Sequence, residues 1–200
     1  LNYLSNNLNN VGINTRLDIK LEDDASLNII NISNENLNNN FLNFRYKVNI
    51  VKISIIKNFS LDINDTSYTY YSFKDLNLEA DASLNVINIS NKNLNNNFLN
   101  FRQKINIGKN SILKNYSLDV NKNSNFKYSF KDIDLEKNSH LEYFILSKGS
   151  KFSKHDINCS LNNEYGSVVL NGIIDLNDER HHEIKTKINH NEENCKSYQL

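Results

Sequence analysis

The run NLNNNFLNFR occurs twice in this chain, at 36–45 and again at 93–102, and it belongs to a much longer repeat. Residues 82–138 can be laid over residues 25–81 at one fixed offset, so that Ala82 falls on Ala25. A third copy begins at Ser139. The other matching runs are ASLN at 25–28 and 82–85, SLD at 60–62 and 117–119, and Leu141, Phe144, Leu146 and Ser147 on Leu84, Ile87, Ile89 and Ser90. Self-similarity at a fixed period predicts a solenoid, in which each repeat buries its apolar residues against its neighbours.

The repeat unit divides into two similar halves. The runs NLEADASL at 77–84, NIGKNSIL at 106–113 and DLEKNSHL at 134–141 resemble one another and begin at nearly equal intervals. One coil of the solenoid therefore takes about 28 residues, which lies within the range typical of such repeats.

Within each coil, apolar and polar residues alternate, as in Leu76 and Leu78, which predicts β-strands. Ile, Val, Phe, Tyr and Thr favour strands, and the Asn clusters between them favour turns. We predict an all-β fold, a right-handed parallel β-helix with two short strands per coil. The turns at Asn34–Asn40 and Asn91–Asn97 are expected to stack one coil apart, with Asn amides hydrogen-bonded along a ladder. The codon bias of an AT-rich genome is a plainer explanation for the abundant Asn, and we favour it.

Length, composition and charge narrow the possible functions. We expect residues 1–200 to form one β-helix domain, with Leu1–Val11 as a lead-in loop. Lys plus Arg and Asp plus Glu both number 23, so nothing indicates nucleic-acid binding. No apolar run is long enough to span a membrane, and the first residues are polar and Asn-rich, unlike those of a signal peptide. The chain lacks Met and opens on Leu1, so we expect an interior fragment of a longer protein.

The two cysteines, Cys159 and Cys195, lie far apart in the sequence. This usage is typical of a reducing compartment, so we expect a cytoplasmic protein, or a stromal one in a plastid-bearing organism. Each cysteine is also explained as a small, inert residue packed in the core.

The last twenty residues contain the candidate site residues. If His181–His190 is a strand, His182, Ile184 and His190 lie on one face, so His190 is on the apolar side. His190 and Cys195 are candidate ligands of zinc or iron. The alternative is a hydrogen-bonded core histidine and a packed cysteine. The preceding run at 168–176, VVLNGIIDL, is expected to be a fully buried strand.

Catalytic motifs are not evident in the sequence. It has five glycines and no nucleophile motif of the GxSxG type. The carboxylate pairs Asp23 and Asp24, and Glu192 and Glu193, fall in predicted turns, where solvated acidic residues are expected. We therefore predict that the chain is not an enzyme.

Three segments, in order, resemble the SufB and SufD family of iron–sulfur cluster assembly proteins, and the SufD branch most closely. They are KGSKFSKHDI at 148–157, LNGII at 170–174 and HHEIKTKINHNEENCKSYQL at 181–200. The positions that match the family motif are His181, Glu183, His190, Cys195, Ser197 and Gln199. The near-identical copying of residues 25–81 by residues 82–138 departs from the family pattern.

The resemblance implies a non-catalytic scaffold subunit of the SUF complex. Such a subunit pairs with a SufB-like subunit through the β-helix and binds a SufC-like ATPase through a C-terminal helical region. We expect that region, and the family's cluster ligands, to lie beyond Leu200. No cofactor is expected on this chain itself; the iron–sulfur cluster belongs to the assembled complex. The alternative is a structural or adhesive Asn-rich β-solenoid with a binding face.

Overall fold

The computed structural model describes residues 12–22, 26–33, 40–51, 54–62, 68–92, 98–120, 126–177 and 179–200. These residues form two parallel sheets of seven strands each. The odd-numbered sheet contains β1 (Gly12–Leu21), β3 (Asn40–Ile50), β5 (Tyr68–Leu78), β7 (Phe98–Ile107), β9 (Phe126–Leu135), β11 (Phe152–Leu161) and β13 (His181–His190). The even-numbered sheet contains β2 (Ser26–Ser33), β4 (Ser54–Asp62), β6 (Ser83–Lys92), β8 (Ile112–Val120), β10 (His140–Lys148), β12 (Ser167–Asp175) and β14 (Lys196–Gln199).

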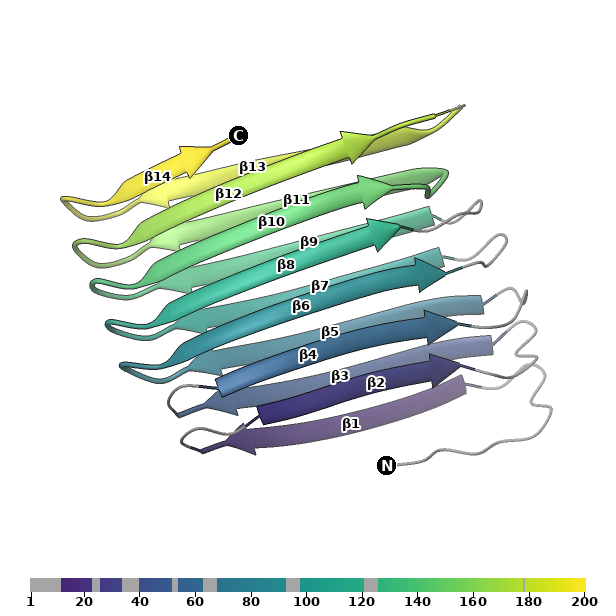
Figure 1. Ribbon diagram of the computed structural model, residues 1–200, viewed down its shortest axis with the longest axis horizontal. Coiled ribbons are helices and arrows are strands. Elements are labelled where there is room, and N and C mark those ends of the chain that lie inside the picture. The colour runs from purple at the N-terminus through teal and green to yellow at the C-terminus, as the bar shows by residue number, and fades with distance from the viewer. Residues whose placement is uncertain are drawn as a thin grey trace.

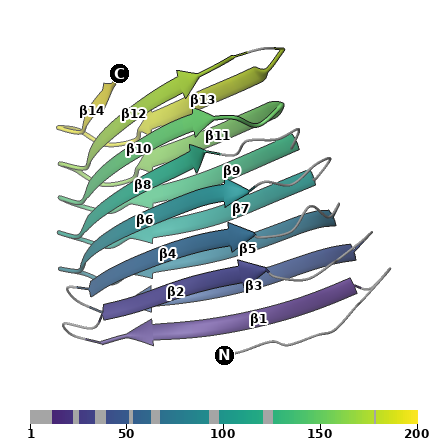
Figure 2. The same cartoon turned by 45° about the vertical axis from the view of Figure 1, so that its right-hand side comes forward.

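The chain alternates between the two sheets and advances by one strand each time it returns to a sheet. In Figure 1 the odd-numbered strands run to the left behind the even-numbered strands, which run to the right, while successive coils rise. This winding is right-handed, and the turned view in Figure 2 shows the same stack of coils. The prediction of a right-handed parallel β-helix is therefore confirmed.

The strand register explains the sequence repeat. Phe41 pairs with Thr69, and Thr69 pairs with Phe98, so the offset that lays Phe98 over Phe41 spans two coils. The third copy is confirmed, because Leu141 pairs with Leu113 and Leu113 with Leu84.

The two Asn-rich turns predicted to stack one coil apart, 34–40 and 91–97, lie mostly outside the described residues. The strands that follow them, β3 and β7, are separated by β5, so the spacing is two coils rather than one. The error came from treating the longer sequence repeat as a single coil.

Inward-facing residues at equivalent positions form columns along the solenoid. Leu84, Leu113, Leu141 and Val168 form one such column, and each is at most 1% exposed. Fully burying one aliphatic side chain of this size contributes roughly 1.5–3 kcal/mol. Since every coil adds one residue to each column, the coils share a single continuous core.

One corner of the solenoid consists of tight turns that repeat in every coil from β5 onward. Each turn has one residue with positive φ, at equivalent positions: Asp81, Asn110, Asn138, Tyr165 and Asn194. Asn and Asp tolerate this left-handed conformation better than other residues that carry a side chain. The Asn110 amide donates to Asp81 Oδ1 (2.8 Å), and the Asn138 amide donates to Asn110 Oδ1 (3.1 Å).

A second amide ladder lies just before the same corner. The Asn77 amide donates to Asn49 Oδ1 (3.0 Å), and the Asn106 amide donates to Asn77 Oδ1 (2.5 Å). Higher up, the Asn191 amide donates to Asn162 Oδ1 (2.9 Å). Amide ladders therefore occur along this corner, and a separate amide pair, in which Asn88 donates to Asn115 Oδ1 (3.0 Å), joins β6 to β8.

The prediction of a fully buried strand at 168–176 is correct only for its first half. Val168 is 1% exposed and Leu170 is 5% exposed, whereas Ile173 is 52% exposed and Ile174 is 40% exposed. Ile173 has the opposite parity to Val168 and Leu170, so it lies on the outer face of β12. Ile174 faces inward, but it lies beyond the segment Ser167–Leu170 with which β14 pairs. The rest of β12 has no described strand beside it on that side.

Candidate functional site

The six positions that match the family motif lie on β13, on the turn after it and on β14. His181 begins β13 and His190 ends it. At about 3.3 Å per residue, these two histidines are roughly 30 Å apart. Five of the six positions therefore form two groups at opposite ends of the last described coil.

His181 and Glu183 extend rows of side chains along the outer face of the odd-numbered sheet. The His181 ring stacks on Phe152 with 5.4 Å between ring centroids, and Phe152 stacks on Phe126 at 6.4 Å. Glu183 Oε2 lies 3.4 Å from Lys154 Nζ. These contacts join β13 to β11, so both residues have a structural role in holding the last coil in register.

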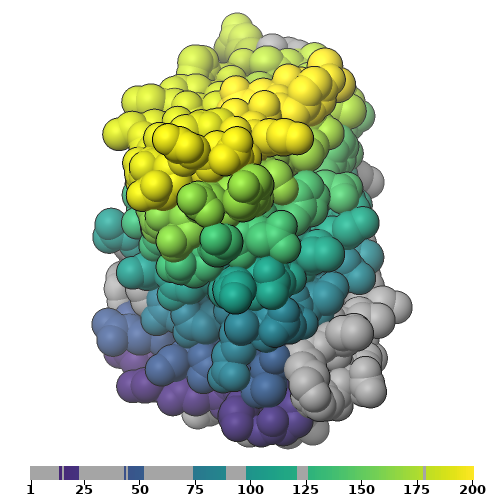
Figure 3. All heavy atoms as spheres, turned by 90° about the vertical axis from the view of Figure 1, so that its left-hand side faces the viewer, coloured from purple at the N-terminus to yellow at the C-terminus, as the bar shows by residue number. Residues whose placement is uncertain are grey.

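His190, Cys195 and Ser197 form the second group, at the corner with the tight turns. His190 occupies an inward-facing position, opposite Leu161, and its Nε2 lies 3.0 Å from Ser197 Oγ. The three residues line an open pocket of about 660 Å³, which we call the last-coil pocket. Its other lining residues are Val168, Val169, Tyr198, Ser167 and Lys196. In Figure 3, which faces this corner, the yellow atoms of the last coil lie at its upper end.

Cys195 also fits its position as a packed residue. It follows the last turn and precedes Lys196, which pairs with Ser167, so its equivalents in earlier coils are Gly166, Ser139, Ser111 and Ala82. All of these residues are small. The Cys195 thiol donates to the Asn163 carbonyl (3.3 Å) and packs against the core.

The structure thus places both predicted metal ligands in one pocket, where metal binding remains a prediction. The described part of the chain has no group of three or more His, Cys, Asp or Glu side chains that could hold a metal ion. Gln199 belongs to neither group, because its amide donates to Thr186 Oγ1 (2.8 Å) across the end of the coil.

The other cysteine is enclosed by the core. Cys159 is 0% exposed, and burial, with smaller effects from Asp132 and Asp134, raises its thiol pKa to about 12. Since the thiolate is the reactive form, Cys159 is an inert core residue at neutral pH.

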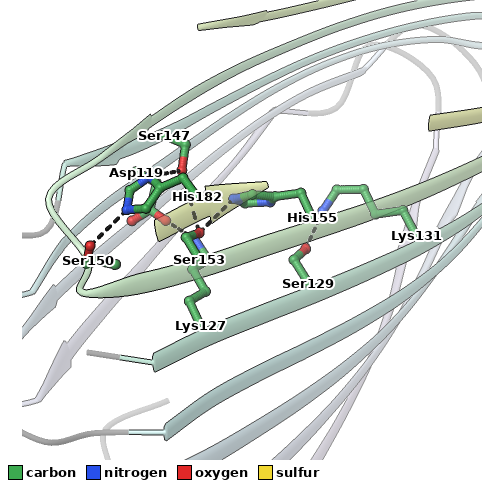
Figure 4. Close-up of polar contacts among 9 residues, drawn as sticks. All are labelled: Asp119, Lys127, Ser129, Lys131, Ser147, Ser150, Ser153, His155 and His182. Atoms are coloured by element: carbon green, nitrogen blue, oxygen red, sulfur yellow. Dashed lines mark hydrogen bonds and ion pairs between the residues drawn. The ribbon is translucent and has the colours of Figure 1, made fainter. Parts of the chain in front are cut away.

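The sequence analysis missed a polar cluster inside the solenoid, at the corner opposite the tight turns (Figure 4). Asp119 Oδ2 lies 2.6 Å from Lys127 Nζ, and the two side chains are 1% and 7% exposed. The cluster comprises Asp119, Lys127, Ser129, Lys131, Ser147, Ser150, Ser153, His155 and His182.

Within the cluster, a chain of hydrogen bonds runs inward from the partly exposed His182. His182 Nε2 donates to the Ser150 carbonyl (2.7 Å), and its Nδ1 lies 3.0 Å from Ser147 Oγ. Ser147 Oγ lies 3.4 Å from Ser153 Oγ, which lies 3.1 Å from His155 Nε2. Two imidazoles and two hydroxyls are thereby connected inside the protein.

The electrostatics of this cluster are dominated by burial. Burial, and then the nearby Lys127, Lys131 and His182, hold the pKa of His155 well below its usual value. His155 is therefore neutral at physiological pH. Burial, and then Lys127 and Lys74, lower the pKa of Lys131 to about 7.

The signal for this cluster was present in the alternation of β9, FKYSFKDIDL. Lys127, Ser129 and Lys131 have the same parity as Ile133 and Leu135, which are buried. In a strand, residues of one parity share one face, so the lysines had to point inward too. Only the apolar members of the pattern were used in the prediction.

The described residues include no helix long and apolar enough to cross a lipid bilayer. No curated protein and no solved structure matches the chain. One family model matches residues 76–200, and its description is the SUF system FeS cluster assembly, SufBD core domain. The match covers more than half of the chain and coincides with the coils from β6 to β14, which contain the last-coil pocket and the polar cluster. The chain therefore belongs to the SufBD core domain family of the SUF iron–sulfur cluster assembly system.

Proposed function

We propose that this chain is a non-catalytic scaffold subunit of a SUF complex, nearer to SufD than to SufB. In this proposal it pairs with a SufB-like subunit through the β-helix and works with a SufC-like ATPase. The observation that carries the proposal is the family match over residues 76–200.

The chemistry of the described side chains supports a scaffold role. The Cys159 thiol is buried and protonated, and both imidazoles of the polar cluster are hydrogen-bonded to neighbouring protein groups. Such groups stabilise a fold more readily than they attack a substrate. We propose that the iron–sulfur cluster is the cargo of the assembled complex, and that the complex works in the cytoplasm.

Within this proposal, His190 and Cys195 support the contact with the SufB-like subunit. Both line the last-coil pocket beside Tyr198, which is 57% exposed and offers an aromatic surface for a partner. Aromatic residues of this kind are enriched at protein interfaces.

The test is co-expression of the tagged chain with SufB-like and SufC-like proteins, followed by affinity purification and native mass spectrometry. We expect one complex that contains all three proteins and yields iron–sulfur clusters on reconstitution. Elution of the folded chain alone would contradict the scaffold proposal and would favour a structural or adhesive solenoid.

The role of the pocket is tested separately with the double variant His190→Ala and Cys195→Ala. We expect a weaker complex and a lower cluster yield. Lys104→Met is the matched control, because Lys104 is exposed on the outer face of β7, away from the last-coil pocket. Normal complex formation and cluster yield in the double variant would count against the role of the pocket.

A further inference from the structure

Two lysines face the interior of the solenoid without a carboxylate partner. Lys74 on β5 pairs with Gln103 on β7, which pairs with Lys131 on β9, so the three share one inward-facing column. Lys131 has the same parity as Ile133, which is 1% exposed, and Lys74 has the same parity as Leu76, which is 5% exposed. Both ammonium groups are therefore directed toward the core.

The positive charge of this column is not balanced inside the described protein. Among the inward-facing side chains that the structure describes, the one carboxylate is Asp119, and it is bonded to Lys127 (2.6 Å). In the same described part of the chain, neither Lys74 nor Lys131 forms an ion pair. Lys131 Nζ donates to Ser129 Oγ (3.2 Å), and Lys74 Nζ lies 5.4 Å from the centroid of the Tyr46 ring. A buried cation without a counter-charge is strongly unfavourable.

Two side chains of the even-numbered sheet, across the interior from Lys131, have hydrogen-bond donors that are not fully satisfied. Asn115 and Tyr143 are register partners on β8 and β10, and each is 1% exposed. Asn115 Nδ2 has no hydrogen-bond partner among the described residues, and Tyr143 Oη forms no hydrogen bond of good geometry there, although the Ser117 hydroxyl lies close enough to influence the Tyr143 pKa. Lys131 Nζ lies 5.6 Å from the centroid of the Tyr143 ring, so the amine and the phenol face each other across the interior. A buried donor without a partner destabilises the folded state.

The interior has room beside these groups. Although they point inward, Lys74 and Lys131 each keep part of their accessible surface, as does Ser117, which lies two residues from Asn115 on the same face of β8. Tightly packed inward-facing side chains, such as Leu113, are 0% exposed. Partial accessibility at inward-facing positions indicates a small internal space next to the amines.

We propose that this space binds a small inorganic anion, held by the ammonium groups of Lys74 and Lys131 and by hydrogen bonds from Asn115 Nδ2 and Tyr143 Oη. Such an anion supplies the missing negative charge and accepts from both unsatisfied donors. Water could satisfy the two donors, but it would leave the charge of the two amines unbalanced. This site is separate from the last-coil pocket and does not depend on the proposed scaffold role.

The experiment measures the melting temperature of the full chain at constant ionic strength while sodium gluconate is replaced stepwise by sodium phosphate, sulfate or chloride. A ligand that binds only the folded state raises the melting temperature in proportion to the logarithm of its concentration above Kd. We expect phosphate, sulfate or chloride to raise the melting temperature by several degrees above the gluconate reference. The three anions distinguish a tetrahedral oxyanion from a halide.

Variants locate the effect. Lys131→Met and Lys74→Met are expected to abolish the response, and Tyr143→Phe is expected to raise the anion Kd roughly tenfold, the usual effect of losing one hydrogen bond to a charged group. Lys104→Met, on the outer face of β7, should respond like the unmodified chain. Tyr143→Phe removes only the hydroxyl group, so it keeps the test usable if a lysine variant does not fold.

Proton uptake gives a second readout. Burial lowers the pKa of Lys74 to about 8, and burial with neighbouring lysines lowers that of Lys131 to about 7. A bound anion favours the charged amines, so adding it to weakly buffered protein at pH 8 should consume protons. The proposal is overturned if no anion raises the melting temperature above the gluconate reference, or if Lys131→Met responds as strongly as the unmodified chain.

Discussion

Asp119 and Lys127 form an ion pair inside the solenoid, with 2.6 Å between Oδ2 and Nζ and with at most 7% of either side chain exposed. Asp119 lies near the end of β8 and Lys127 near the start of β9, so the pair joins the two sheets where the chain crosses between them. The Lys127 ammonium also lies 5.3 Å from the centroid of the Phe101 ring. Two opposite charges are thereby enclosed at a position where no water is needed to balance them.

Removing one member of this pair is expected to destabilise the fold strongly. Asp119→Asn should lower the free energy of unfolding by about 3–5 kcal/mol, because Lys127 is left buried without its counter-charge. The double variant Asp119→Leu with Lys127→Met should recover most of the loss. Urea denaturation followed by circular dichroism measures both changes.

The matched control is the ion pair of Lys148 and Asp175, whose side chains are 47% and 48% exposed. Asp175→Asn should change stability by less than about 1 kcal/mol, since exposed pairs are screened by solvent. An equal loss in Asp119→Asn and Asp175→Asn would show that burial does not determine the strength of the inner pair.

Lys131 is expected to make stability depend on pH. Its pKa is about 7 in the folded chain, against an ordinary value of 10.5, mainly because of burial. Below pH 7 the folded state bears the full cost of a buried charge. Between pH 7 and 10.5 the unfolded chain binds more protons than the folded one, so stability rises with pH across this window.

Lys131→Met removes the part of this dependence that Lys131 contributes, whereas Lys74, whose pKa burial lowers to about 8, still contributes above that pH. At pH 7 the variant should be more stable than the unmodified chain by a few kcal/mol, and the difference should shrink as the pH approaches 10. Thermal or urea unfolding at several pH values measures this, in gluconate, so that no anion contributes. A stability difference between Lys131→Met and the unmodified chain that stays constant from pH 7 to pH 10 would argue against a buried, titrating Lys131. So would a Lys104→Met variant whose stability depends on pH in the same way as that of Lys131→Met.

Gly108 is required by the close approach of two coils. A Cβ atom at this position would lie 2.7 Å from the Leu78 carbonyl oxygen and 2.8 Å from the Glu79 carbonyl carbon, which are backbone atoms. Gly108→Ala should therefore lower stability by roughly 1–3 kcal/mol, as overpacked sites do. At Gly172 the nearest atom is the flexible Cδ1 of Ile184, at 3.0 Å, so Gly172→Ala should be tolerated. Urea unfolding of the two variants tests this contrast, which fails if they lose the same stability.

The sequence was sufficient to predict the solenoid, because each coil repeats the same residue types at the same positions. Asn77, Asn106 and Asp134, which begin the three similar runs, are direct register partners on β5, β7 and β9. The residue types alone were a poorer guide to which side chains are buried. Ile173 and Ile174 read as core residues, but Ile173 lies on the outer face of β12, and Ile174 is exposed because β14 does not extend beside it.

The polar interior was missed for a different physical reason. Apolar alternation identifies an inward face, but Lys127 and Lys131 on that face read as solvated residues when each is considered alone. Their inward orientation becomes evident only from parity with Ile133, and the carboxylate partner of Lys127, Asp119, comes from the other sheet. Pairing across sheets depends on the cross-section of the coil, which a single repeat does not encode.

Tyr165 occupies a turn position that suits Asn better. Its φ is 63°, and the equivalent residues Asn138 and Asn194 have φ values of 56° and 59°. The left-handed backbone conformation destabilises a non-Gly residue by roughly 1–2 kcal/mol, and by less when the residue is Asn. Lys137 Nζ lies 5.9 Å from the centroid of the Tyr165 ring, and an exposed cation–π contact of this kind contributes about 0.5–1 kcal/mol of stabilisation.

Tyr165→Asn should therefore raise the melting temperature by a few degrees. Differential scanning calorimetry measures the change, and Tyr198→Asn, at an exposed strand position, is the control without a turn effect. A lower melting temperature in Tyr165→Asn would mean that the aromatic contact outweighs the backbone strain.

Cys195 separates a packing role from a metal-binding role in the last-coil pocket. Ser139 and Ser111 occupy the equivalent place in earlier coils, where both are buried and both donate to a turn carbonyl within 2.6 Å. Cys195→Ser should accordingly leave the free energy of unfolding unchanged within about 0.5 kcal/mol in metal-free buffer. A loss above about 1 kcal/mol would contradict equivalence of these positions. Repeating the melt with added Zn²⁺ tests the other role: if His190 and Cys195 bind metal together, Zn²⁺ raises the melting temperature of the unmodified chain, and both Cys195→Ser and His190→Ala remove that rise.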